Sequence, residues 1–140
     1  RLKKAPALPA LKMKPQCYTR MFYGCKKLEA TPELPAKILA RNCYASMFSN
    51  CTSLTVPAKL QAAAFEENCY ADMFEGCRNI RLSEYKTNEY TEKYIIPADS
   101  DNPTDVKALT KMFSRTGGNF TGTPEANKTY YVTEKENDKG

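Results

Sequence analysis

The stretch CYTRMFYGCKKL, residues 17–28, returns twice at an interval of 26 residues, as CYASMFSNCTSL from Cys43 and as CYADMFEGCRNI from Cys69. Six columns therefore recur in three copies: Cys, Tyr, Met, Phe, Cys, and Leu or Ile. A fixed period of about 20 to 50 residues is typical of solenoids, in which each unit buries its apolar side only against its neighbours. We therefore expect a stacked array whose repeated side chains form the core and whose function lies on its surface.

The spacing inside each copy predicts a short helix. Tyr44, Met47, Phe48 and Cys51 stand at i, i+3, i+4 and i+7, which places all four on one helical face, and the other copies repeat this spacing. Methionine packs favourably beside aromatic rings, so we interpret the stripe as core rather than as a cofactor site. We expect the homologous rings to stand in single file: Phe22, Phe48 and Phe74.

The residues after each predicted helix indicate a strand, centred on Leu28, Leu54 or Ile80, that stacks in parallel on its equivalents at about 4.8 Å. Alternate side chains of a strand point to opposite faces, so the leucine column faces inward and its neighbours face outward. A proline-bearing loop then returns the chain. The outward positions, which form the predicted partner-binding face, are Lys3, Lys27, Glu29, Ser53, Thr55, Asn79 and Arg81.

A 26-residue unit with Met-Phe-x-x-Cys-x-x-Leu followed by Pro-x-Leu-Pro-Ala resembles the BspA-like branch of the leucine-rich repeats, over residues 2–82. The resemblance implies an α/β leucine-rich-repeat solenoid, a right-handed superhelix of short parallel strands and short helices. It also implies an extracellular or cell-surface protein that mediates adhesion. This chain differs from the usual form in having Met where Ala is common and an extra Cys-Tyr before it.

The repeat register breaks after residue 82, which divides the chain into two parts. Residues 1–82 form the expected array, which opens halfway through a repeat, so we expect further repeats or a cap upstream. Residues 83–140 hold an insertion, a degenerate last repeat at Met112 and Phe113, and an irregular C-terminal cap. A fourth helix from about Val106 and a strand around Tyr130 to Val132 are expected in this part.

Six cysteines leave several interpretations open. The two cysteines of a repeat are eight residues apart, about 12 Å along a helix, which is too far for a disulfide. Cysteines of different repeats could lie close enough, and a bridge such as Cys25 to Cys43 is one alternative. Metal sites favour close Cys-x-x-Cys pairs, which the chain lacks. We favour buried reduced thiols that act as small apolar residues, and we expect neither a metal nor another cofactor.

The composition supplies little for catalysis. The chain has no histidine, so nucleophilic schemes with a histidine base are excluded, and it has no glycine-rich phosphate loop. Asp99, Asp101 and Asp105 resemble a calcium loop, but Pro103 and Thr104 interrupt the pattern. We therefore expect a protein that is not an enzyme.

Charge is distributed unevenly, although the formal sum is only +5. Residues 1–60 carry eleven lysines and arginines against two glutamates, whereas residues 61–140 carry ten against fourteen acidic residues. We interpret the basic half as a solvated surface rather than as a nucleic-acid site, because only Tyr23 there would be exposed to stack on a base. No apolar run approaches the roughly 18 residues that a membrane span needs.

The predicted function is a non-enzymatic, secreted or cell-surface module whose partner is a protein, such as a host extracellular or matrix protein. Two alternatives stay open: a glycan-binding accessory module of a larger secreted protein, and a structural spacer. Amphipathic aromatic residues on an irregular segment are good recognition anchors. The secondary recognition candidates in the insertion are Tyr85, Tyr90 and Tyr94, although we favour packing across the end of the array as their role.

Overall fold

The computed structural model describes residues 18–34, 36–62, 65–97 and 107–133. Within these ranges the regular elements are the strands β1 (Arg81–Ser83), β2 (Tyr90–Ile95), β3 (Gly117–Gly118) and β4 (Thr129–Thr133). They form one sheet in the order β2-β4-β1-β3. β1 is parallel to β3, whereas β4 is antiparallel to both β1 and β2.

The predicted fold class, an α/β leucine-rich-repeat solenoid of short helices and short parallel strands, is wrong. The described residues contain no helix, and their strands lie in one small sheet of mixed direction. The strands expected at Leu28 and Leu54 are not formed, and the third begins at Arg81, just after Ile80. In contrast, the strand predicted around residues 130–132 is confirmed by β4. No helix that could cross a membrane occurs in the described part of the chain.

Rows of tight turns replace the predicted helices. We call each of the segments 18–25, 42–51, 68–77 and 107–116 a turn row. Within a segment, alternate N–H groups donate to the carbonyl three residues earlier, as from Met47 to Tyr44 at 3.2 Å. The intervening N–H groups donate to the following segment, as from Tyr44 to Cys69 and from Phe48 to Met73, both at 2.9 Å. Each row of turns is therefore hydrogen-bonded to the next row.

A left-handed backbone at every fourth residue explains why no helix forms. φ is +58° at Asn42, +54° at Ser46 and +61° at Asn50. Each of these residues is third in a four-residue turn, where a type II turn requires positive φ. A right-handed helix excludes such residues, because its φ is near −63°. Over two turns, a period of four selects the same inward residues as a period of 3.6, so the spacing of Tyr44 and Phe48 fits both.

Aromatic rings stand in columns along the stack. The Phe22 and Phe48 rings lie 5.6 Å apart between centroids, and the Phe48 and Phe74 rings 5.5 Å apart, with both pairs of planes within 6° of parallel. The predicted single file of these three rings is confirmed. A second column runs beside it and consists of Tyr18, Tyr44 and Tyr70.

The degenerate copy adds a further layer to the stack. Tyr70 donates its N–H to the carbonyl of Ala108 at 2.9 Å, and the Phe113 ring stacks on Phe74 at 5.5 Å. The helix expected here is wrong for the same reason as the others, because φ is positive at residues 107, 111 and 115. Its expected start at Val106, like the aspartates at 99, 101 and 105, lies outside the described residues.

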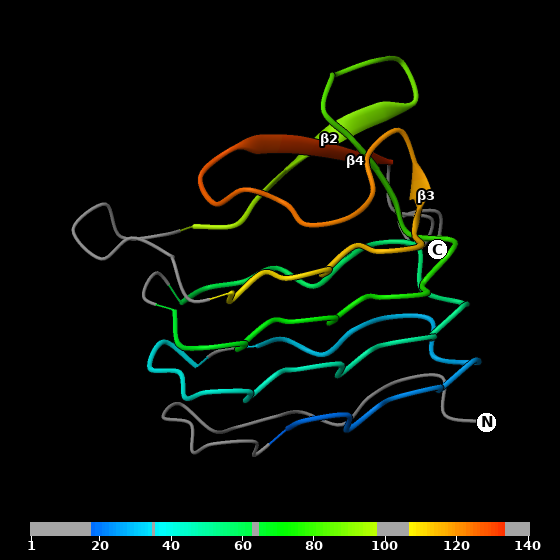
Figure 1. Cartoon of the computed structure of the whole chain (residues 1–140). Coiled ribbons are helices and arrows are strands. Elements are labelled where there is room, and N and C mark those ends of the chain that lie inside the picture. Colours follow the sequence, from blue (N-terminus) through cyan, green and yellow to red (C-terminus); the bar gives the residue numbers. More distant parts are fainter. Residues whose placement is uncertain (1–17, 35, 63–64, 98–106, 134–140) are drawn as a thin grey trace.

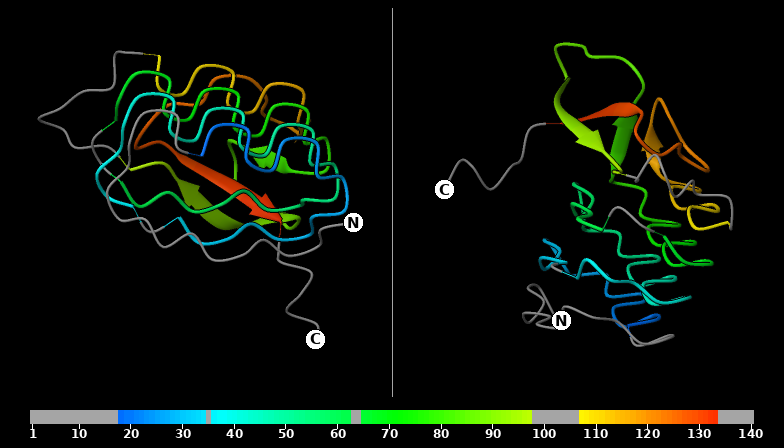
Figure 2. Two further views of the ribbon diagram at one scale, coloured as in Figure 1. Left: turned by 90° about the horizontal axis from the view of Figure 1, so that it is seen from below. Right: turned by 90° about the vertical axis from the view of Figure 1, so that its left-hand side faces the viewer.

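The four-stranded sheet covers one end of the stack, as Figures 1 and 2 show from three sides. Gly117 donates its N–H to the carbonyl of Ile80 at 2.9 Å, which ties β3 to the third repeat. Tyr94 of β2 donates its hydroxyl to the carbonyl of Ala58 at 2.7 Å, and its ring meets the Phe113 ring edge-on at 6.1 Å. The sheet is therefore fixed to the stack by buried contacts.

Buried thiols fill the space beside the rings. Cys51, Cys69 and Cys77 are fully buried and carry free thiols. The Cys51 thiol donates to the carbonyl of Phe22 at 3.0 Å, and the Cys77 thiol to that of Phe48 at 2.9 Å. Burial raises the pKa of Cys51 to about 11 and the pKa of Cys69 and of Cys77 to about 12. All three cysteines act as small core residues, and Cys51 and Cys77 also donate one hydrogen bond each.

Raising the pH above 9 is expected to destabilise the fold through these thiols. Each folded-state pKa lies above the unfolded value of about 8.5, so the stabilisation is complete below that pH and is lost as the pH rises toward 11 and 12. Each thiol adds a slope of up to about 1.4 kcal/mol per pH unit in this window. Urea unfolding at pH 8, 9 and 10 measures the slope. Cys77→Ala should reduce the pH dependence of the unfolding free energy by the contribution of one thiol. An unchanged slope would show that burial does not raise the pKa of Cys77.

Candidate functional site

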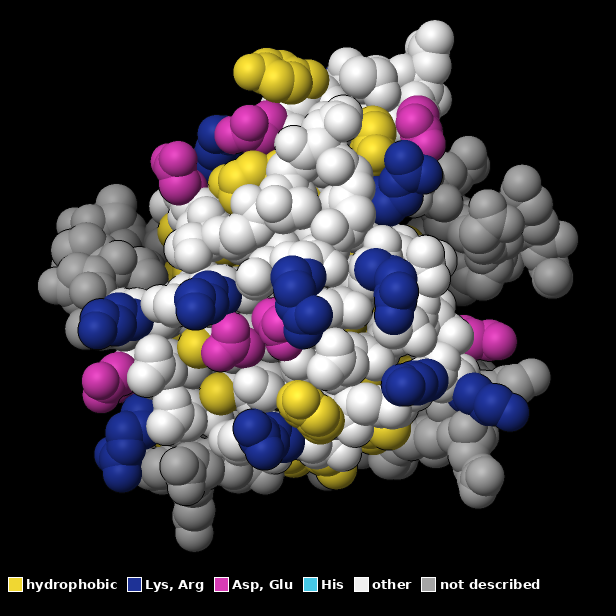
Figure 3. All heavy atoms as spheres, turned by 45° about the vertical axis from the view of Figure 1, so that its right-hand side comes forward, with side chains coloured by type: hydrophobic (Ala, Val, Ile, Leu, Met, Phe, Trp, Pro, Cys, Tyr) yellow, Lys and Arg dark blue, Asp and Glu magenta, His cyan; other side chains and the backbone are white. Residues whose placement is uncertain are grey.

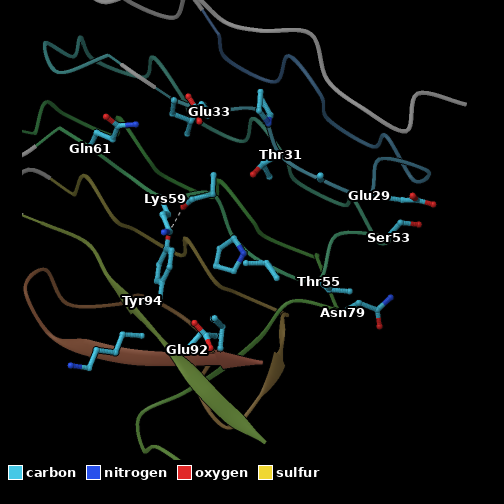
Figure 4. Close-up of a pocket in the computed structure, with 18 residues that line it drawn as sticks. Glu29, Thr31, Glu33, Ser53, Thr55, Lys59, Gln61, Asn79, Glu92 and Tyr94 are labelled. Atoms are coloured by element: carbon cyan, nitrogen blue, oxygen red, sulfur yellow. Dashed lines mark hydrogen bonds between the residues drawn. The ribbon is translucent and has the colours of Figure 1, made fainter. Parts of the chain in front are cut away.

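A groove of about 1130 Å³ runs along one side of the stack. Its volume is slightly above the usual range for sites that hold small ligands, about 300–1,000 Å³. Its walls come from the segments after the first three turn rows, from β2 and from Val132 of β4 (Figure 4). The polar and charged residues that line it are Glu29, Thr31, Glu33, Ser53, Thr55, Lys59, Gln61, Asn79, Glu92 and Lys93.

The structure brings together four residues of the predicted partner-binding face. Glu29, Ser53, Thr55 and Asn79 all line the groove, and Figure 4 shows them following one another across three successive repeats. Two other members of that face, at positions 27 and 81, are exposed but do not line it. The last member, Lys3, lies outside the described residues.

Two of these four residues also hold the repeats together. The Ser53 hydroxyl donates to the carbonyl of Lys26 at 2.6 Å, and the Asn79 amide donates to the carbonyl of Thr52 at 2.5 Å. Both bonds reach back to the preceding repeat. They link the repeats where the sequence predicted a parallel strand ladder, so Ser53 and Asn79 have a structural role as well as a place in the groove.

The sequence interpretation missed the groove residues that follow the predicted strands, such as Thr31, Glu33 and Lys59. Thr31 and Glu33 continue the alternation that begins at Glu29. Lys59 occupies the column of Glu33, 26 residues further on. Extending the outward positions by two and four residues would have found these residues. The residues of β2 gave no such signal, because the insertion has no other copy with which to align.

Charges of both signs line the groove. Glu29, Glu33 and Glu92 supply carboxylates, whereas Lys59 and Lys93 supply ammonium groups. All five side chains are exposed. These ions are not buried, so the protein does not bear the large desolvation cost that buried charges carry, and a charged partner can pair with them directly. Among the described residues, no group of three or more His, Cys, Asp or Glu side chains could hold a metal ion.

The tyrosines of the insertion divide into two kinds. Tyr90 and Tyr94 are only 4% exposed, and burial raises the pKa of the Tyr94 hydroxyl above its usual range. The Arg81 guanidinium lies over the Tyr90 ring, 5.9 Å from its centroid. Tyr85, in the loop between β1 and β2, is 72% exposed. Of the three secondary recognition candidates, Tyr85 presents its ring to solvent, and the other two are packing residues.

Basic side chains do not gather into one patch on the face seen in Figure 3. Lysines and arginines are spaced across it, with acidic side chains between them. Ion pairs among the described residues include Arg81 with Glu89 at 3.3 Å and Arg115 with Glu75. Nucleic-acid sites instead concentrate basic residues on one face or stripe. This face therefore carries charges of both signs rather than a single basic patch.

The structure defines a class of protein: a stack of short repeats with a polar groove along one side and a sheet at one end. No known protein family, curated protein or solved structure matches the chain. The resemblance to BspA-like repeats therefore depends on the repeat motif alone. The function has to be argued from the groove.

Proposed function

We propose that this protein is a non-enzymatic recognition module that binds a polypeptide partner in the groove. The observation that carries the proposal is the lining itself, in which exposed polar and charged side chains from successive repeats lie beside β2. Groove positions vary between repeats, as from Glu29 to Thr55 and from Glu33 to Lys59, while the core columns stay the same. Repeat arrays commonly use such extended surfaces for binding.

A polypeptide suits this lining better than a glycan. Sugars stack on exposed aromatic faces, and the ring of Tyr94, the aromatic residue in the lining, is 4% exposed. Carboxylates and ammonium groups side by side can instead complement a chain that carries both charges, which gives specificity. The resemblance to BspA-like repeats implies an extracellular or cell-surface setting, in which the partner would be an extracellular or matrix protein.

A displayed library of random 12-residue peptides, selected on the immobilised protein, tests the proposal. Selected peptides should bind the groove, so the charge reversals Glu33→Lys and Lys59→Glu should each weaken binding at least tenfold in calorimetric titrations. Lys37→Glu is the matched control, because Lys37 is also exposed but does not line the groove. This variant should bind like the original protein.

Three outcomes decide between the candidate functions. Peptides whose binding depends on Glu33 and Lys59 support a polypeptide-binding module. If no such peptide is found but a glycan array yields ligands that these two substitutions weaken, the glycan-binding alternative is right and the proposal is wrong. If neither library yields a ligand that depends on the groove, the protein is a spacer.

A further inference from the structure

β2 is the outermost strand of the sheet. The strand order is β2-β4-β1-β3, and among the described residues β2 pairs only with β4. An edge strand presents a row of unpaired N–H and C=O groups, which is a template for pairing with another extended chain. β2 has six residues, the usual length of a strand, so it can hold an extended segment of similar length.

Alternate residues of β2 turn their main-chain groups toward this open edge. In an antiparallel pair, residues of one parity bond to the partner strand and those of the other parity point away. The carbonyl of Ile96 accepts from the N–H of Asn127, in the loop before β4, at 2.8 Å. In the regular part of the ladder, Glu92 and Tyr94 therefore face β4, whereas Tyr90, beyond the irregularity, exchanges hydrogen bonds with Thr87 in the preceding loop. The N–H and C=O groups of Lys93 and Ile95 point to the open edge.

The same edge borders the groove. Glu92, Lys93 and Tyr94 belong to β2, and all three line the groove. Figure 4 shows Glu92 near Tyr94, whose hydroxyl donates to the Ala58 carbonyl on the stack. A chain laid against β2 runs alongside β2 and would therefore border the groove where β2 lines it, with alternate side chains directed toward the lining.

An extended polypeptide matches both the open edge of β2 and the charged lining of the groove. Its main-chain donors and acceptors recur at about 3.4 Å per residue, the spacing of the groups along β2. The charged lining can then select among sequences, and Ile95, which is 43% exposed, offers an apolar contact at the end of the strand. Charged residues such as Lys93 on an edge strand discourage indiscriminate pairing. The edge therefore favours a selected partner over aggregation.

We propose that the polypeptide bound in the groove adds a strand to the open edge of β2. Main-chain hydrogen bonds to Lys93 and Ile95 then supply affinity, and the side chains of the groove supply specificity, as in other cases of strand addition. This inference rests on the proposed function and gives the mode in which its partner is held.

A proline substitution tests the main-chain contact. Lys93→Pro removes an N–H that points to the open edge and leaves the bonds to β4 in place, which edge strands tolerate. Lys93→Ala is the matched control, because it removes the side chain and keeps the N–H. With a groove-dependent peptide from the selection, Lys93→Pro should bind at least tenfold more weakly than Lys93→Ala. Equal affinities of the two folded variants would overturn the inference.

Hydrogen exchange in the unsubstituted protein provides a second test that does not depend on how the proline variant folds. The amides of Lys93 and Ile95 should exchange fast in the unbound protein and at least tenfold more slowly with the selected peptide bound. Slow exchange of both amides without peptide would mean that the edge is already paired, and would overturn the inference. Groove-dependent binding that leaves both amides fast would also overturn it, while the proposed function would stand.

Discussion

Replacing Gly118 with alanine is expected to lower the free energy of unfolding by about 3–5 kcal/mol. φ at Gly118 is +85°, and a Cβ there would stand 2.5 Å from both the nitrogen and the oxygen of Leu82. These atoms belong to the backbone of β1 and cannot move aside without breaking its pairing with β3. The adjoining bond from the Asn119 N–H to the Leu82 carbonyl, 2.8 Å long, would be lost as well. Urea unfolding measures the effect.

Gly122→Ala is the matched control for this prediction. φ at Gly122 is +102°, but no atom lies within 4 Å of the position that its Cβ would take. The substitution should therefore cost only the backbone strain, about 1–2 kcal/mol. Equal losses at the two glycines would contradict the close approach of β3 to β1.

Met47→Ala is expected to lower the free energy of unfolding by about 2–5 kcal/mol, whereas Met21→Ala should lower it by less than about 1 kcal/mol. The two methionines occupy the same column of the repeat, so their sequence surroundings are alike. Met47 is fully buried between layers, and Met21 is 46% exposed. The difference therefore arises from their places in the stack. Similar losses in urea unfolding of the two variants would contradict that placement.

The repeat period predicted which side chains stack but not the backbone that carries them. Identical columns at 26-residue intervals were enough to predict the file of phenylalanine rings. The helix prediction failed because apolar spacing alone cannot distinguish a period of 3.6 from one of four. A signal for the turns was present, since one column reads Gly24, Asn50 and Gly76 and another holds Asn42 and Asn68. Glycine and asparagine are the residues that most readily adopt positive φ, and φ is positive at all five.

The candidate site was predictable where it belongs to the repeats and not where it belongs to the insertion. Alternation along the predicted strand placed Glu29 and Thr55 outward, and both line the groove. The contribution of β2 depends on contacts between distant parts of the chain, such as the bond from Tyr94 to Ala58. Nothing in the local pattern of the insertion indicates such contacts, so the sequence could not separate Tyr90 and Tyr94, which are buried, from the exposed Tyr85.

The central claim is that successive repeats are hydrogen-bonded to one another through rows of turns. Scalar couplings across hydrogen bonds, measured by NMR on the protein labelled with ¹³C and ¹⁵N, test it most directly. We predict couplings from the amide nitrogens of Tyr44 and Phe48 to the carbonyl carbons of Cys69 and Met73, respectively. Couplings from the same nitrogens to carbonyls four residues earlier in the chain, as in a helix, would contradict it.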